Sequence, residues 1–195
     1  MPVDTDTWQL ILTSFWPMFS AGITATIPLA LISFAIGLLL AITAALMRIS
    51  GNRILSGIAR VYISAIRGTP LLVQIFVIFY GLPQIGVRID AYLAAVIALS
   101  LNVGGYAAEV VRAAILSVPK GQWEAGFTVG LSRATALRRI ILPQAARVSV
   151  PPLSNTFISL VKDTSLVAQI TVAELFLAAQ RIAAFSSEFL VVYIE

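Results

Sequence analysis

Residues 124–143 read EAGFTVGLSRATALRRIILP, a stretch with three arginines that lies between strongly apolar segments. Gly130 can adopt the left-handed backbone that ends a helix, and Ser132 can cap the helix that follows. Pro143 lacks a backbone donor and disfavours helical geometry in the preceding residue, so we expect the second helix to end there. The stretch therefore predicts two short helices. A simple chain reversal that happens to be helical is the alternative.

The composition around this stretch is that of a membrane protein. Hydrophobic residues make up 59% of the chain and charged residues 11%, whereas soluble domains are about half apolar and about a quarter charged. A chain of 195 residues has room for about four or five spans of about 20–25 residues. The net charge of +4 could indicate nucleic-acid binding, but the basic residues cluster beside apolar segments, which favours membrane orientation. We therefore expect an all-α integral membrane protein.

Cysteine and histidine are absent from the sequence. Their absence excludes disulfides, thiol nucleophiles and Ser-His triads, and it removes common ligands of zinc and haem. Few carboxylates lie in the apolar segments, so an intramembrane enzyme is the least favoured class of function. We expect no catalytic residue, no metal site and no cofactor.

Four apolar segments are predicted as complete spans, at residues 23–46, 64–82, 91–115 and 148–172. A further apolar run starts at Phe189, and its seven residues are too few to cross a bilayer. We therefore expect a fifth span that begins here and is cut at Glu195. Residues 1–18 precede the first span, and residues 19–195 are predicted to form one membrane domain.

The basic residues predict the orientation of these spans. No Lys or Arg precedes Arg48, and the N-terminus carries Asp4 and Asp6, so we expect no cleaved signal peptide. Lysines and arginines follow the first and third spans, while the connection between the second and third holds only Arg88. Because short basic loops face the cytoplasm, residues 119–147 are predicted to be cytoplasmic and residues 1–18 periplasmic.

The loop motif and several other blocks resemble the permease subunits of ABC importers. The family motif, E-A and then G followed by I-x-L-P, is matched by Glu124, Ala125, Gly130, Ile140, Leu142 and Pro143. Gly126 stands where the family more often has alanine. Four blocks are similar to polar amino-acid uptake permeases, most of all to the L-cystine type: RGTPLLVQ at 67–74, KGQWEA at 120–125, LPQAAR at 142–147 and KDTSL at 162–166.

The resemblance implies a type I ABC importer transmembrane domain, with four complete spans and the start of a fifth in this sequence. It implies a multi-pass subunit of a bacterial inner membrane that pairs with a second permease subunit, as a homodimer or a heterodimer. Cytoplasmic ATPase subunits would drive transport, and a periplasmic amino-acid-binding protein would deliver the substrate. The alternative function is an ion-coupled secondary amino-acid transporter, which needs no docking loop.

The two helices of the loop are the predicted contact with the ATPase, seated in a groove of that subunit. Neither Lys120 nor Lys162 lies in a Walker A motif, so the energy of ATP must enter through a partner. Glu124 is expected in the first turn of its helix, where its negative charge would interact favourably with the helix dipole and could pair with a cation of the partner. The alternative is that Glu124 is a solvated carboxylate without a docking role. Docking is assigned to Gly121, Glu124, Ala125, Gly126, Gly130 and Arg138.

Polar side chains on the third span follow helical spacing. Asn102, Tyr106 and Glu109 are four and three residues apart and share one face. Glu109 and Arg112 could instead neutralise each other, since charges within a membrane usually have partners. The interpretations of Glu109 as a ligand contact and as half of a structural pair both stay open.

The second and fourth spans carry further polar residues. The block from Arg67 to Pro70 is expected to break the second helix, with Gln74 on the same side as Arg67. The fourth span is expected to start at Pro151 and Pro152, and its Asn155, Ser159 and Lys162 share a face. Lys162 and Asp163 could serve a zwitterionic amino acid or form a salt bridge. The substrate pathway is assigned to Gln74, Asn102, Glu109, Ser159 and Asp163.

Overall fold

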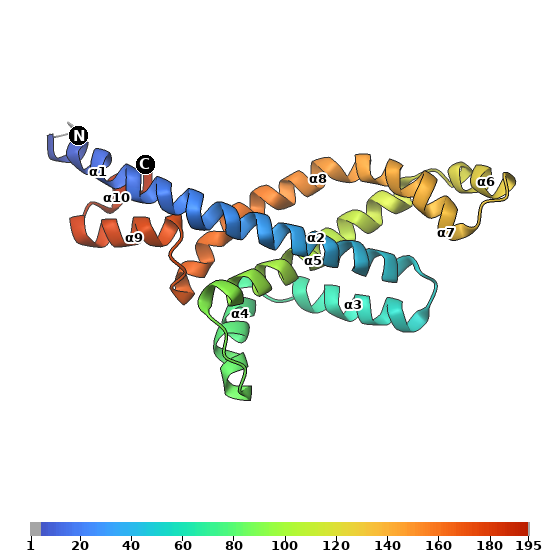
Figure 1. Cartoon of the computed structure of the whole chain (residues 1–195), viewed down its shortest axis with the longest axis horizontal. Helices are drawn as coiled ribbons and strands as arrows, with labels where there is room; N and C mark the ends of the chain where they lie inside the picture. The colour runs from blue at the N-terminus through green and yellow to red at the C-terminus, as the bar shows by residue number, and fades with distance from the viewer. Residues whose placement is uncertain (1–4, 195) are drawn as a thin grey trace. The chain divides into compact units, whose positions relative to one another are not determined.

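A computed structural model describes residues 5–194, which contain helices and no strands. Asp4 therefore lies outside the described residues, as does Glu195, where the predicted fifth span is cut. The α-helices are α1 (Thr5–Ala21), α2 (Ile27–Ile49), α3 (Arg53–Arg67), α4 (Leu71–Phe76), α5 (Ala91–Ser117), α6 (Lys120–Thr128), α7 (Arg133–Ala136), α8 (Leu142–Asp163), α9 (Leu175–Ser186) and α10 (Phe189–Ile194) (Figure 1). π-Helical turns occupy Gly22–Thr26, Val77–Gly81 and Leu137–Ile141, and 3-10 segments occupy Leu82–Ile85 and Thr164–Ile170. The predicted all-α class is confirmed.

Two helices among the described residues are long and apolar enough to cross a membrane, Thr7–Ile49 and Ala91–Ser117. The number rises to four if each of two bent helix pairs counts as one span. The second of the long helices covers the predicted third span, residues 91–115, and is long and apolar enough to form it. The first is longer than the span expected at residues 23–46, because the π-helical turn Gly22–Thr26 joins α1 to α2 without a break.

The second predicted span, 64–82, is not one helix. The expected break is confirmed, since α3 ends at Arg67 and α4 begins at Leu71. Pro70 has no backbone N–H to continue the hydrogen bonding of α3. The helix before the break instead extends back to Arg53, where the side chain of Asn52 caps it by accepting bonds from two backbone amides at 2.9 and 3.2 Å. The expectation that Gln74 shares a helical face with Arg67 is therefore wrong.

The fourth predicted span also differs from expectation. Pro151 and Pro152 lie inside α8 rather than at its start. Each removes one hydrogen bond, but a helix of 22 residues keeps its other bonds on both sides of the pair. The α-helix then ends at Asp163, and a 3-10 segment continues to Ile170, where Thr171 turns the chain with a φ of +63°.

The described residues form two compact units, each built from separate stretches of chain. The first includes the described residues up to Ser33 together with Leu72–Ala98 and the chain from Leu160 onward. Its core joins α1, α9 and α10 through Met18, Ala179, Ala183 and Val192. The backbone amide of Leu175 donates to the hydroxyl of Thr26 at 3.1 Å, so the start of α9 is tied to the turn after α1.

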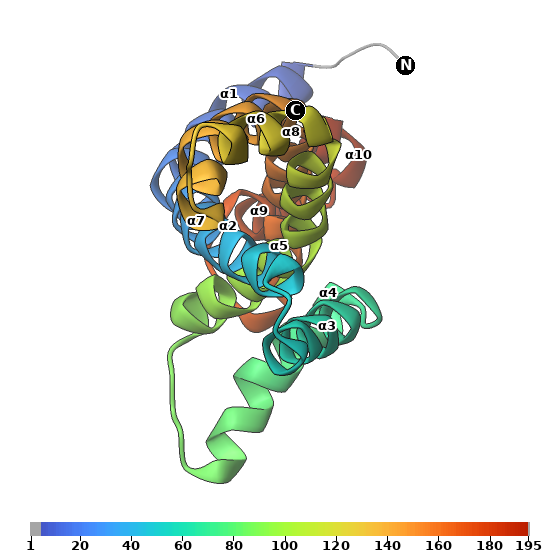
Figure 2. The same ribbon diagram turned by 90° about the vertical axis from the view of Figure 1, so that its right-hand side faces the viewer.

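The second unit contains Phe34–Leu71 and Leu99–Ser159. In it α2 and α3 run antiparallel as a hairpin (Figures 1 and 2). Small residues let α5 approach this hairpin closely: a Cβ added at Gly104 would lie 2.9 Å from Cβ of Leu40 and would also overlap the hydroxyl of Tyr62. That hydroxyl donates to the carbonyl of Leu101 at 2.8 Å. Gly104 therefore sets the spacing of the helices that carry the candidate site.

Candidate functional site

The loop between α5 and α8 folds as two short helices, as predicted. Helix α6 ends in a Schellman motif, in which the amide of Leu131 donates to the carbonyl of Gly126 at 3.0 Å and that of Gly130 to Phe127 at 2.9 Å. Gly130 makes this turn possible because its φ is +79°, a backbone angle that residues with a Cβ rarely adopt. Ser132 caps α7 by accepting from the amide of Thr135 at 3.3 Å.

Pro143 does not end the second helix. The chain passes from α7 through the π-helical turn Leu137–Ile141 directly into α8, which contains Pro143 in its first turn. In the π-helical turn the amide of Leu142 donates to the carbonyl of Leu137, five residues back. This wider turn lies just before the proline, where the ring would otherwise crowd a regular α-helix. Helix α7 therefore continues into α8 without a break.

A buried cluster fixes the loop to the ends of the long helices. It contains Ala114, Ile115, Val118, Ile141 and Ala145, and Trp123 of α6 packs against it together with Leu46 and Ile49 of α2. The amide of Gln144 adds a hydrogen bond to Gln122 at 3.0 Å. Sequence reasoning did not identify Trp123 as an anchor, although an aromatic residue in an otherwise polar helical turn was an available signal.

The predicted docking residues divide into exposed and buried positions. Gly121, Glu124, Ala125, Gly130 and Arg138 are exposed, as a contact surface requires. Gly126 is buried, and a Cβ there would lie 3.2 Å from both Ala136 and Ile140. Gly126 therefore allows α6 to pack against α7 and the turn that follows, and it does not contribute to the exposed surface.

Glu124 lies one turn later in its helix than expected. Helix α6 begins at Lys120, after the extended backbone of Pro119, so its first turn contains no acidic residue. The helix dipole acts mainly on charges in the first turn, and it therefore contributes little to Glu124. Within residues 5–194 the described ion pairs do not include Glu124. Its carboxylate is an exposed negative charge available to a partner.

The polar stripe on α5 contains a charge cluster. Glu109 accepts from Nε and Nη2 of Arg112 at 2.9 and 2.7 Å, and Arg48 of α2 approaches its other oxygen at 4.0 Å. The guanidinium of Arg67 lies 5.6 Å from the ring centroid of Tyr106, a cation–π contact. Of the two interpretations of Glu109, the geometry supports the structural pair. Asn102 is half-buried on the same helix.

The other predicted pathway residues lie on two other helices, α4 and α8. Gln74 is in α4, beyond the break after α3, while Ser159 is exposed on α8 and Asp163 is the last residue of that helix. Asn155 and Lys162 are also exposed on α8. Among the described residues, Lys162 and Asp163 form no ion pair with each other. The expected alternative of a salt bridge between them is therefore not observed.

Substitution of Gly130 tests the turn between the two loop helices. Gly130→Ala should destabilise the turn by about 1 kcal/mol, because alanine is strained at positive φ. Hydrogen exchange of the amides in residues 120–136 should then become faster. Gly130→Asn is the matched control, since asparagine tolerates the left-handed conformation and should leave exchange close to that of the unsubstituted protein. Equal exchange in all three proteins would contradict this role of Gly130.

Comparison with known proteins places these features in context. A family model described as "Binding-protein-dependent transport system inner membrane component" matches residues 37–194. The L-cystine transport system permease protein TcyB of Bacillus subtilis is 60% identical over 189 residues, which cover 96% of this chain and 81% of that protein. The glutamine transport system permease protein GlnP of Escherichia coli K12 is 42% identical over 170 residues, covering 86% and 78%.

A solved structure is also similar over the whole chain. The crystal structure of an amino acid ABC transporter with histidines matches with a TM-score of 0.87 and 38% sequence identity, covering 100% of this chain and 89% of that one. The match extends over every described element of this chain.

Proposed function

We propose, since this chain belongs to the family of binding-protein-dependent transport system inner membrane components, that it is the permease through which a polar amino acid, of the class of L-cystine, enters the cell. Members of this family are the membrane subunit of an ATP-driven importer, and ATP is hydrolysed by a separate subunit. The chain is therefore not an enzyme. Its relatives and the similar structure are ABC permeases, which rules against the ion-coupled alternative. The type I importer fold implied by the sequence is confirmed.

The loop formed by α6 and α7 is the proposed docking site for the ATPase. One observation carries this proposal: Trp123 packs against the buried cluster at the ends of α2 and α5, while Glu124 stays exposed. A movement of the ATPase that pulls on the exposed side would be transmitted to the helices through the cluster, because packed cores resist deformation. The contact surface consists of Gly121, Glu124, Ala125, Gly130 and Arg138.

The proposed partners bind on opposite sides of the membrane. Two copies of an ATPase subunit would bind on the cytoplasmic side, and a periplasmic binding protein would deliver the amino acid to a pair of permease subunits. Arginines flank the end of α2 and fill the loop after α5, so the positive-inside rule places residues 119–147 in the cytoplasm and residues 1–18 in the periplasm. Residues 19–195 form the membrane domain, in which four spans and part of a fifth are expected.

The substrate pathway is proposed to include Asn102, Gln74, Ser159 and Asp163. These positions supply amide, hydroxyl and carboxylate groups that a zwitterionic amino acid can hydrogen-bond. Glu109 has a different role, because Arg112 and Arg48 neutralise it. It stabilises the cytoplasmic half of α5 against α2, and it shapes the pathway without contacting the ligand.

Uptake by the complete importer tests the proposed function. The full-length permease is expressed with its neighbouring ATPase and binding-protein genes, and uptake of labelled cystine, arginine and glutamine is measured. We expect cystine to enter at the highest rate, and a catalytically inactive ATPase subunit to abolish its uptake. A protonophore should leave uptake unchanged while ATP is held constant. Uptake that continues without ATP hydrolysis would contradict the proposal, and preference for arginine or glutamine would overturn the assignment of substrate.

A further inference from the structure

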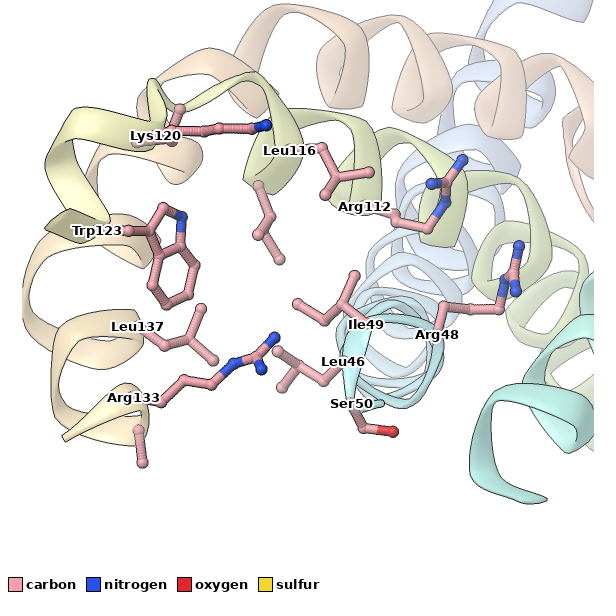
Figure 3. A pocket seen from close by; sticks show the side chains of 13 residues that line it. Leu46, Arg48, Ile49, Ser50, Arg112, Leu116, Lys120, Trp123, Arg133 and Leu137 are labelled. Atoms are coloured by element: carbon pink, nitrogen blue, oxygen red, sulfur yellow. The ribbon is translucent and has the colours of Figure 1, made fainter. Parts of the chain in front are cut away.

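A cavity of about 830 Å³ lies between the loop and the ends of α2 and α5 (Figure 3). It is separate from the exposed docking surface, because Trp123, Arg133 and Leu137 point from the loop helices toward the end of α2. Most of its walls are apolar, formed by Leu46, Ile49, Ile115, Leu116, Val118, Trp123, Ala134 and Leu137. Such a volume accommodates a ligand the size of a small organic molecule.

The same cavity is lined by four cationic side chains, Arg48, Arg112, Lys120 and Arg133. A single carboxylate, that of Glu109, contacts Arg112 and Arg48. Lys120 and Arg133 have no ion-pair partner in the part of the chain that the structure describes. The cavity therefore has an excess of positive charge beside an apolar wall, a combination that neither a neutral nor a purely polar ligand would match.

The cavity lies at the level where the apolar helices would leave the membrane. Part of its apolar wall, formed by Leu46, Ile49, Ile115 and Leu116, belongs to the last turns of α2 and α5, where the apolar helices end and the basic residues begin. Leu116 in this wall is 60% exposed, although it is a large hydrophobic side chain. At such a boundary a lipid can place its acyl chains against leucine and isoleucine while its headgroup meets lysine and arginine.

We propose that this cavity binds the headgroup of an anionic phospholipid. The phosphate is held by Lys120 and Arg133, with Arg48 and Arg112 adding to the positive field, and the first part of an acyl chain lies on Leu46, Ile49 and Leu116. Because the walls of the cavity come from both the loop and the long helices, a bound lipid holds the loop in place against α2 and α5. This site is independent of which solute the permease carries.

Lipid binding to the purified full-length permease, in complex with its ATPase, tests this site. Retention of phosphatidylglycerol and of phosphatidylcholine is measured by native mass spectrometry. The variant Lys120→Gln/Arg133→Gln should bind phosphatidylglycerol about 30-fold more weakly, from about a fivefold effect of each charge near a membrane surface. Arg139→Gln/Arg147→Gln is the matched control: it removes the same charge from the same region, and neither residue lines the cavity. Its binding should be unchanged.

Two further measurements distinguish a bound phospholipid from a bound free phosphate ion. Leu116→Ser should weaken phosphatidylglycerol binding severalfold, because it alters only the apolar wall of the cavity. Since the side chain of Leu116 is exposed, the substitution should leave the fold intact. Millimolar inorganic phosphate should not displace the lipid. The proposal would be overturned if both double variants lost phosphatidylglycerol binding equally. It would also be overturned if inorganic phosphate displaced the lipid fully, or if Leu116→Ser left phosphatidylglycerol binding unchanged. Because the readout is lipid retention, its failure would leave the proposed transport function intact.

Discussion

Glu124→Lys is expected to reduce amino-acid uptake by at least about thirtyfold while the permease inserts into the membrane at its usual abundance. Glu124 is exposed on α6 and forms no ion pair with the described residues, so its reversal should not disturb the fold. On a docking surface, however, it would place a positive charge opposite the partner cation, and like charges across an interface cost several kcal/mol. Uptake and copurification of the ATPase should fall together.

Glu188→Lys is the matched control for this prediction. It makes the same change of charge at another exposed glutamate, next to α10 and outside the loop. Permease abundance is measured in isolated membranes for both variants, and ATPase copurification is measured in mild detergent. Normal uptake by Glu124→Lys at equal abundance would mean that the exposed side of α6 does not carry the coupling contact.

Gly104→Ala should lower the thermal stability of the detergent-solubilised permease by about 5 °C or more. The added methyl group would lie 2.9 Å from Cβ of Leu40, which belongs to a neighbouring helix and cannot rotate away. Overpacking of this kind costs about 1–3 kcal/mol, and each kcal/mol changes the melting temperature of a chain of this size by about 2–4 °C. The hydrogen bond from Tyr62 to Leu101 would also be displaced.

Gly57→Ala provides the comparison, because it makes the same substitution inside a neighbouring helix. A Cβ at Gly57 meets no atom within 4 Å. Alanine favours the helix over glycine by about 1 kcal/mol, so this variant should be as stable as the unsubstituted protein or slightly more stable. The thermal stability of both variants is measured by heating the protein and quantifying the unaggregated fraction by size-exclusion chromatography. If the two variants melt together, close packing at Gly104 does not limit the stability of the unit.

The parts of the fold that were predictable from sequence depend on neighbours along the chain. The turn at Gly130 and the cap at Ser132 were predicted because left-handed geometry and capping are properties of single residues in a short stretch. The break before α4 was predictable because Pro70 removes a local hydrogen bond. The long helix α5 was predictable because its stretch of sequence is mostly apolar and long enough to cross a membrane.

The sequence by itself thus determined the class of protein, the family motif and the presence of two short helices in the loop. Only the tertiary structure decided what those helices contact. Gly126 faces Ala136 and Ile140, and Trp123 packs against a buried cluster. Arg48 approaches Glu109 from a helix about sixty residues earlier in the chain. Such contacts follow from how helices pack in three dimensions, and no periodicity along the chain encodes them. Helix α8 likewise continues through its prolines because the hydrogen bonds on both sides of them outweigh a local preference to end.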